Sequence, residues 1–223
     1  MKILIEAFIF DIDGTLIDSV DYHAEAWVKA FDKFGRKIKF YEARRQVGKG
    51  GDQFLPEFLL KKEIKEFGKD LEDERGKIFK RDFLSGIKPF PQVRELFERI
   101  RADGRRVVLA SSAKADELEV YKKIARIEDL IESETSADDA EKSKPEPDIF
   151  QAALEKLGKI NKKNVVVVGD TAYDAEAAAK INLKTIGVLT GGWTANELRS
   201  AGCQEVYRDA ADIFANYKKI IKG

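Results

Sequence analysis

The stretch that decides the fold of this chain is Ala7-Phe8-Ile9-Phe10, followed at once by Asp11-Ile12-Asp13-Gly14-Thr15-Leu16. The apolar run predicts a buried strand, which we place over residues 3–10, and Gly14 lets the chain turn after it. Two carboxylates one residue apart at the end of a buried strand are unfavourable unless a cation balances their charge. A divalent metal ion would do so, and one of the acids could then act as a nucleophile in phosphoryl transfer.

Downstream of this strand the chain divides into a helical stretch and an alternating stretch. Apolar spacing predicts a first helix from about Ser19 to Phe34, and almost entirely helical structure continues to about Ser85. After a stiff connector at residues 87–91, strands and helices alternate. The predicted strands cover residues 107–109, 130–131, 165–168, 185–188 and 205–207, and the predicted helices cover residues 92–102, 116–124, 148–157, 173–181, 195–200 and 210–221.

Alternating strands and helices are typical of a parallel sheet that is covered by helices on both faces. Continuous apolar strands such as Val165–Val168 fit burial on both sides. We therefore predict an α/β fold with a Rossmann-like core, formed by residues 1–16 and 88–223. Residues 17–87 are predicted to form an all-helical segment, inserted after the first strand.

The composition narrows the range of partners. The 40 Lys and Arg residues cancel the 40 Asp and Glu residues, so no net charge favours nucleic acid or an anionic membrane. No apolar run approaches the length of a membrane span, and the single cysteine, Cys203, excludes an intrachain disulfide. We expect a cytoplasmic monomer or homodimer without a nucleic-acid or membrane partner.

Polar side chains follow several strands of the predicted sheet. Because ligands of an open parallel sheet bind beyond the carboxyl ends of its strands, we expect these side chains to meet. The set comprises Asp11, Asp13, Ser111, Ser112, Asp170 and Asp174, together with Lys144 before a helix. Carboxylate ligands without clustered His or Cys favour Mg²⁺ over zinc.

The other members of this set suit a phosphoryl group. Lys144 can balance the negative charge of the phosphoryl group and the nucleophile. Ser111 can form a hydrogen bond with a phosphate oxygen, and backbone N–H groups near Gly14 and Ser112 can add donors. The pattern therefore predicts phosphate chemistry at the carboxyl edge of the sheet.

Four motifs in this order resemble those of the haloacid dehalogenase-like hydrolase superfamily. They are Asp11-Ile12-Asp13-Gly14-Thr15, then Ser111, then Lys144 in Ser143-Lys144-Pro145-Glu146-Pro147-Asp148, and finally Gly169-Asp170-Thr171-Ala172-Tyr173-Asp174. The helical segment resembles the small cap of the phosphatase subgroup that includes phosphoglycolate phosphatase and β-phosphoglucomutase.

The resemblance implies roles for the acidic residues. Asp11 would accept the phosphoryl group as an aspartyl-phosphate, and Asp13 would act as general acid and then as general base. Mg²⁺ would contact Asp11, the backbone carbonyl of Asp13, and Asp170. Asp174 would orient the waters of the metal or Lys144, although it could merely favour a helix N-terminus. Thr15 would position Asp13 or serve only as a turn residue.

Asp13 also bears on the type of reaction. Dehalogenases of the superfamily lack an acid at this position, since a halide leaving group needs no proton. The resemblance therefore implies a Mg²⁺-dependent phosphatase that acts on a small phosphorylated metabolite. A sugar phosphomutase of the β-phosphoglucomutase type is the alternative, and a non-catalytic binding protein on the same fold is a third possibility.

Two residues of the helical segment are candidate substrate contacts. His23, the only histidine, lies on the first predicted helix near Trp27, where a packing role is equally compatible with its position. Lys49 lies in the loop Gly48-Lys49-Gly50-Gly51-Asp52, which could contact an anionic substrate or serve as an ordinary connection. The mutase has an arginine in this loop region, and Lys49 cannot provide the same bidentate grip on phosphate.

Overall fold

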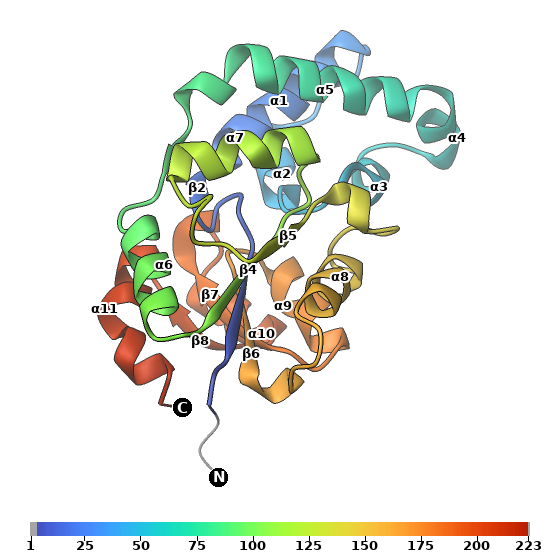
Figure 1. Ribbon diagram of the computed structural model, residues 1–223. Helices are drawn as coiled ribbons and strands as arrows, with labels where there is room; N and C mark the ends of the chain where they lie inside the picture. Colours follow the sequence, from blue (N-terminus) through green and yellow to red (C-terminus); the bar gives the residue numbers. More distant parts are fainter. Residues whose placement is uncertain (1–3, 223) are drawn as a thin grey trace.

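The strand that precedes the acidic pair lies inside a six-stranded parallel sheet (Figure 1). In the computed structural model, which describes residues 4–222, the strand order is β5-β4-β1-β6-β7-β8. The strands are β1 (Ala7–Phe10), β4 (Arg106–Ala110), β5 (Ser133–Thr135), β6 (Val165–Gly169), β7 (Lys184–Val188) and β8 (Cys203–Tyr207). This confirms the predicted parallel sheet and places Asp11 between two neighbouring strands, β4 and β6.

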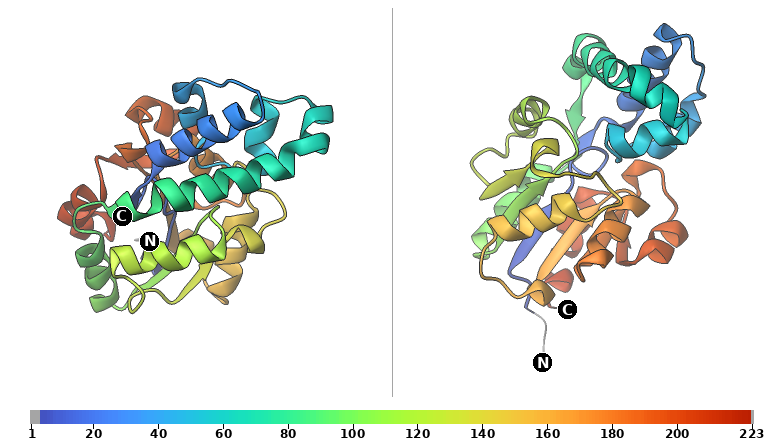
Figure 2. Two further views of the ribbon diagram at one scale, coloured as in Figure 1. Left: turned by 90° about the horizontal axis from the view of Figure 1, so that it is seen from above. Right: turned by 90° about the vertical axis from the view of Figure 1, so that its right-hand side faces the viewer.

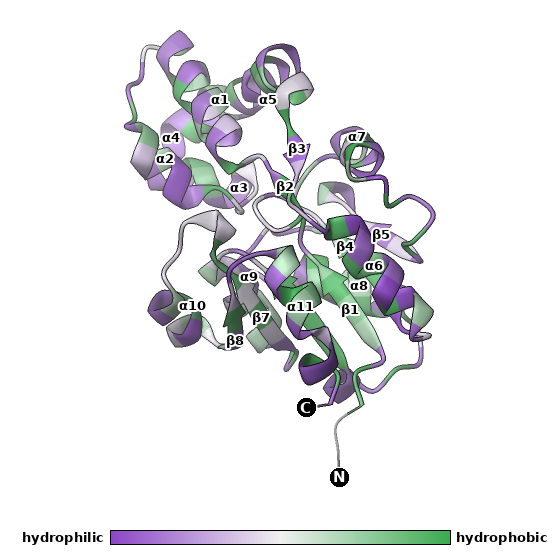
Figure 3. Cartoon of the chain, turned by 90° about the vertical axis from the view of Figure 1, so that its left-hand side faces the viewer, coloured by the Kyte–Doolittle hydropathy of each residue, from purple (hydrophilic) through white to green (hydrophobic). Residues whose placement is uncertain are grey.

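Two layers of helices cover the sheet because side chains alternate along each strand. Phe8 and Phe10 of β1 belong to the core that includes residues of α6 (Val93–Ala102) and α11 (Ala210–Ile220). Ala7 and Ile9 belong to the core that includes residues of α8 (Asp148–Lys156) and α9 (Ala172–Lys180). The strands β1 and β4 are correspondingly apolar (Figure 3). The helices that follow the strands are α6 (Val93–Ala102), α7 (Ala115–Ala125), α8 (Asp148–Lys156), α9 (Ala172–Lys180), α10 (Ala195–Ala201) and α11 (Ala210–Ile220).

A helical segment lies beyond one end of the sheet, opposite the two termini (Figures 1 and 2). Its helices are α1 (Val20–Lys33), α2 (Phe40–Gln46), α3 (Gly51–Phe54), α4 (Lys61–Glu63) and α5 (Lys69–Asp82), with a π-helical turn at Ile64–Gly68. The chain enters the segment through β2 (Ile17–Asp18) and leaves it through β3 (Lys88–Pro89), which pair as an antiparallel ribbon. Among residues 4–222, no helix is both long and apolar enough to cross a membrane.

Two predicted strands differ from the structure. The first begins at Ala7, which pairs with Arg106 and Val165, the first residues of both neighbouring strands. Residue 3 of the predicted strand lies outside the described part of the chain, and residues 4–6 precede the observed strand. The strand predicted at Leu130-Ile131 is wrong, because β5 lies at Ser133–Thr135. These polar residues pair with β4 at the edge of the sheet. The presence of a pairing strand therefore matters more than apolar character in deciding where this strand forms.

The contact between Phe10 and Phe97 tests how much the helix layer stabilises β1. Both side chains are fully buried, and their ring centroids are 4.8 Å apart. We expect Phe97→Ala to lower the free energy of unfolding by about 3–5 kcal/mol, because it leaves a cavity against β1. Leu60→Ala, at a side chain that is 74% exposed, is the control and should cost less than about 0.5 kcal/mol. Equal losses in denaturant unfolding would contradict this account.

Candidate active site

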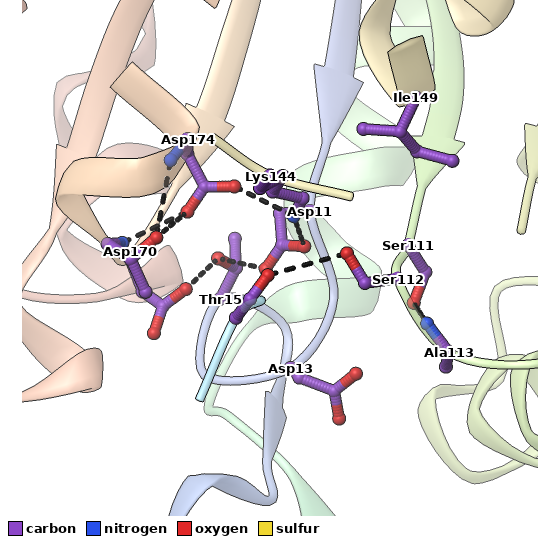
Figure 4. A network of polar contacts seen from close by, with 12 residues as sticks. Asp11, Asp13, Thr15, Ser111, Ser112, Ala113, Lys144, Ile149, Asp170 and Asp174 are labelled. Carbon is purple, nitrogen blue, oxygen red and sulfur yellow. Dashed lines mark hydrogen bonds and ion pairs between the residues drawn. The ribbon is translucent and has the colours of Figure 1, made fainter. Parts of the chain in front are cut away.

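The acidic pair lies in a tight turn at the carboxyl end of β1. Gly14 adopts a φ of 81°, which side chains disfavour, and its N–H donates a hydrogen bond to the carbonyl of Ile17. This closes the turn directly before β2. The side chains of Asp11 and Asp13 leave the turn in different directions, and only Asp11 joins the buried acidic cluster (Figure 4).

Lys144 links Asp11 to the helix that follows β6. Its ammonium group forms an ion pair with Asp11 Oδ1 and donates a hydrogen bond of 2.8 Å to Asp174 Oδ1. The lysine side chain is only 1% exposed. Burial alone would lower the pKa of Lys144, but the two carboxylates raise it above its usual range. Lys144 therefore remains charged beside Asp11.

Asp11, Asp170 and Asp174 form the acidic cluster that the sequence places at this edge. One ligand atom from each lies within 4.8 Å of the others, and all three residues are buried. Asp170 Oδ2 is buried and has no hydrogen-bond partner within residues 4–222, whereas Asp170 Oδ1 accepts a hydrogen bond from Thr15 at 3.2 Å. An unpartnered carboxylate oxygen beside a second carboxylate fits a hard divalent cation such as Mg²⁺.

Burial and neighbouring charges raise the pKa values of Asp11 and Asp170. Burial is the main reason that the pKa of Asp11 rises to about 7, and the charge of Asp174 adds to the effect while Lys144 opposes it. Burial and the charges of Asp11 and Asp174 likewise raise the pKa of Asp170 well above its usual range. The single positive charge of Lys144 does not balance the three buried acids, and a bound cation would compensate for the remaining negative charge.

Glycine is required on both sides of Asp170. A Cβ atom on Gly14 or on Gly191 would lie 2.1 Å from Asp170 Oδ2. Gly191 ends the short turn Leu189–Gly191 after β7, a place that the sequence analysis did not connect with the site. Gly14 and Gly191 thus form a cradle around this oxygen, and any side chain larger than hydrogen at either position would collide with it.

Asp174 performs two structural tasks at once. Its Oδ2 accepts hydrogen bonds from the backbone N–H and the hydroxyl of Thr171, which forms a capping box at the start of α9. Its Oδ1 accepts from Lys144. Because both oxygens already have partners, the helix-terminus role and the Lys144-orienting role are compatible, and direct metal ligation would compete with both.

Asp13 faces the opposite direction, toward the helical segment. Its Oδ1 accepts a hydrogen bond from Ser19 at 2.6 Å and lies 2.9 Å from His23 Nε2. Burial would raise the pKa of Asp13, but His23 and the hydrogen bond from Ser19 lower it below its usual value. The side chain of Asp13 therefore lies outside the cluster of Asp11, Asp170 and Asp174, although we expected the four acids to lie together. The metal contact expected of Asp13 is through its backbone carbonyl and stays a prediction. His23, which the sequence offers as a candidate substrate contact, lies beside Asp13.

The remaining predicted residues surround the same edge. Ser111 is fully buried, and its hydroxyl accepts a hydrogen bond from the N–H of Ala113. The Ser112 hydroxyl lies 3.4 Å from the carbonyl oxygen of Gly48, in the helical segment. Lys49 donates to Glu57 at 2.8 Å and to Gln46 at 2.6 Å, so its ammonium is engaged within the helical segment.

A cavity between the sheet and the helical segment brings most of these residues together. Its lining comprises Asp11, Asp13, His23, Trp27, Val47, Gly48, Lys49, Arg75, Ser112, Ala113 and Glu117. Arg75 of α5 and Glu117 of α7 are missing from the sequence-based set. Glu117 lies in the first turn of α7, shortly after the Ser111 motif, and could have been considered from that position. No local pattern marks Arg75, because only the packing of α5 brings it to the cavity.

The cradle around Asp170 leads to a prediction about metal binding. Gly191→Ala should weaken Mg²⁺ affinity by roughly 10–100-fold, since its methyl group would displace the Asp170 carboxylate. Gly76→Ala is the matched control, because an added Cβ there meets nothing within 4 Å. Calorimetric titration of both variants with Mg²⁺ checks this. Equal affinities would refute the assignment of Asp170 as a ligand.

The raised pKa of Asp11 predicts how the stability of the metal-free protein depends on pH. The value of about 7 exceeds the ordinary 3.8, so the folded state binds more protons between about pH 4 and pH 7. The contribution of Asp11 to the free energy of unfolding should therefore fall as pH rises through this window. Denaturant unfolding in a chelator should show a weaker decline in Asp11→Asn than in the unsubstituted protein. A steeper decline in the variant would contradict the assignment.

Comparison with known proteins identifies relatives of this architecture. A family model described as haloacid dehalogenase-like hydrolase matches residues 5–182, which include all four motifs. The chain is 30% identical over 190 residues to a phosphoglycolate phosphatase of Aquifex aeolicus, and the match covers 82% of this chain and 84% of that protein. A solved hydrolase from Pseudomonas syringae is similar, with a TM-score of 0.87, 29% identity and coverage of 96% and 98%.

A plant relative is much longer. The chain is 32% identical over 220 residues to the chloroplastic protein SUPPRESSOR OF QUENCHING 1 of Arabidopsis thaliana. That match covers 95% of this chain but 20% of the plant protein, so the chain spans about a fifth of this relative.

Proposed function

This chain belongs to the haloacid dehalogenase-like hydrolases, and we propose that within this family it is a Mg²⁺-dependent phosphatase acting on a small phosphomonoester. The observation that carries the proposal is the arrangement around Asp11. The ammonium group of a buried lysine contacts this carboxylate, and Asp13 borders the same cavity. Asp170 belongs to the same acidic cluster and has one oxygen without a hydrogen-bond partner within residues 4–222. The phosphatase name of the Aquifex relative agrees with this reading.

The first half of the reaction requires a nucleophile and a proton donor. The Asp11 carboxylate attacks the phosphorus atom while the bond from phosphorus to the ester oxygen breaks. Asp13, protonated in the substrate-bound state, gives its proton to that oxygen, and the product alcohol leaves. The two side chains leave one turn in different directions, so they can serve opposite sides of a phosphoryl group.

The second half releases inorganic phosphate. Asp13 takes a proton from water as the water oxygen attacks phosphorus, and the bond to Asp11 breaks. Lys144 holds Asp11 in place, and Asp174 holds Lys144. Bound Mg²⁺, held by Asp11, Asp170 and the Asp13 carbonyl, would stabilise negative charge on the phosphoryl oxygens.

We propose that the helical segment, residues 17–87, acts as a cap over the site. Arg44 of α2 donates a hydrogen bond of 2.8 Å to the carbonyl of Gly191, and Arg45 lies over the Trp193 ring at 3.2 Å. These contacts join α2 to the loop that borders Asp170. The paired strands β2 and β3 are suitable hinges for an opening that admits substrate and a closure that excludes water.

The nucleophile assignment predicts the behaviour of one variant. With a panel of small phosphate esters, the protein should release phosphate only when Mg²⁺ is present, and Asp11→Asn should lower the rate by roughly 10⁴-fold or more. Asp103→Asn is the control and should retain activity, because this exposed residue lies in the turn before β4, at the amino end of the strand and away from the site. Phosphate release is followed in parallel with Mg²⁺ binding. Unchanged turnover in Asp11→Asn would reject the mechanism.

The same panel separates the other candidate functions. A phosphomutase would require a sugar bisphosphate for activity and would return the phosphoryl group to a second hydroxyl. The engagement of Lys49 by Glu57 and Gln46 offers no specific support for that reading. Metal binding without turnover of any ester would instead favour a binding protein.

A further inference from the structure

His23 occupies a position between the two halves of the molecule. It lies on α1, yet its ring contacts the catalytic turn, α5 and α7. Nε2 lies 2.9 Å from Asp13 Oδ1 and 3.1 Å from the hydroxyl oxygen of Tyr121. Nδ1 lies 3.4 Å from a guanidinium nitrogen of Arg75. Both ring nitrogens thus have protein partners, and neither is left for a substrate.

The partners of the ring determine where its proton lies. Arginine has only donors, so Nδ1 must accept from Arg75 and carry no proton. Nε2 must then be protonated, and it donates to the Asp13 carboxylate. In the other neutral tautomer, the N–H at Nδ1 would face an N–H of Arg75, and the lone pair of Nε2 would face the carboxylate oxygen of Asp13.

Packing fixes the plane of the same ring. Phe79 of α5 stacks on His23 with ring centroids 3.9 Å apart and an interplanar angle of 11°. Tyr121 of α7 is almost completely buried, and its hydroxyl reaches Nε2 from the core side. The ring therefore cannot turn without losing the stack and the Tyr121 contact.

We propose that Arg75 and Tyr121 are positioning residues, that Arg75 holds His23 as the Nε2–H tautomer while Tyr121 fixes the position of the ring, and that His23 in turn orients Asp13. The consequence for Asp13 rests on its proposed role as proton carrier. Ser19 and His23 both engage Oδ1, and no hydrogen bond within residues 4–222 involves Oδ2. Oδ2 is then the oxygen left to exchange a proton with the leaving group and with water.

The arrangement also links the helical segment to the chemistry. His23 and Arg75 belong to α1 and α5, whereas Asp13 and Tyr121 belong to the sheet domain side. Asp13 is held in this orientation only while α1 and α5 lie against α7. Opening of the helical segment would therefore release the proton carrier as well as expose the nucleophile.

Nitrogen NMR tests the tautomer directly, because His23 is the only histidine of the chain. With ¹⁵N-labelled histidine in the metal-free protein at about pH 7.5, the spectrum should show a protonated Nε2 and an unprotonated Nδ1. Arg75→Met should let Nδ1 acquire a proton in part of the population, and Arg75→Lys, which also offers only donors, should preserve the original pattern. Arg81→Met on the exposed side of α5 is the control.

Kinetics of phosphate release test the effect on Asp13. Tyr121→Phe removes a hydroxyl that does not line the cavity, so kcat should fall roughly 3- to 10-fold with KM unchanged. Tyr217→Phe, at another buried tyrosine in α11, should leave both constants unchanged.

The two measurements fail independently of the proposed function. A protonated Nδ1 in the unsubstituted protein, or an Arg75→Met spectrum identical to the original, would overturn the positioning proposal whatever the protein catalyses. A rise in KM without loss of kcat in Tyr121→Phe would also overturn it, because Tyr121 would then act on substrate binding. The expected spectrum in a protein without phosphatase activity would leave the tautomer established and reject only the proposed function.

Discussion

The buried ammonium group of Lys144 lies between the carboxylates of Asp11 and Asp174 and joins three separate parts of the chain. Asp11 ends β1, Lys144 lies in the loop before α8, and Asp174 lies in the first turn of α9. Removing one member of such a group leaves an uncompensated buried charge, which costs several kcal/mol. The positions of Asp11, the proposed nucleophile, and of the start of α9 both depend on these ion pairs.

One lysine does not balance three buried acids. Burial, together with the charges of the neighbouring acids, raises the pKa values of Asp11 and Asp170, and a bound divalent cation would favour the ionised carboxylates. Within residues 4–222, Asp170 Oδ2 also lacks a hydrogen-bond partner, which fits such an ion. Gly14 and Gly191 preserve the space that this oxygen needs. The unfavourable burial of charge in the metal-free site and the phosphate chemistry proposed for it thus have the same physical origin.

Much of the fold and of the catalytic edge could be predicted from the sequence because both depend on local patterns. The apolar run before Asp11, the alternation of strands and helices, and the motifs at Ser111, Lys144 and Asp170 each signal their place without knowledge of packing. The error at Leu130-Ile131 has the opposite cause. The edge strand forms at polar residues because the backbone of β4 pairs with the chain there. The apolar character of a segment does not indicate where such pairing occurs.

The sequence by itself determined the order of the strands along the chain, the acids that follow them and the family to which the chain belongs, because strand periodicity and motif spacing are local properties. Only the tertiary structure decided that Asp13 turns away from Asp11 and Asp170 toward His23. It also decided that Arg75, Tyr121 and Gly191 come within reach of the site. Residues from distant segments meet through packing, and packing has no signature in the spacing of any one segment.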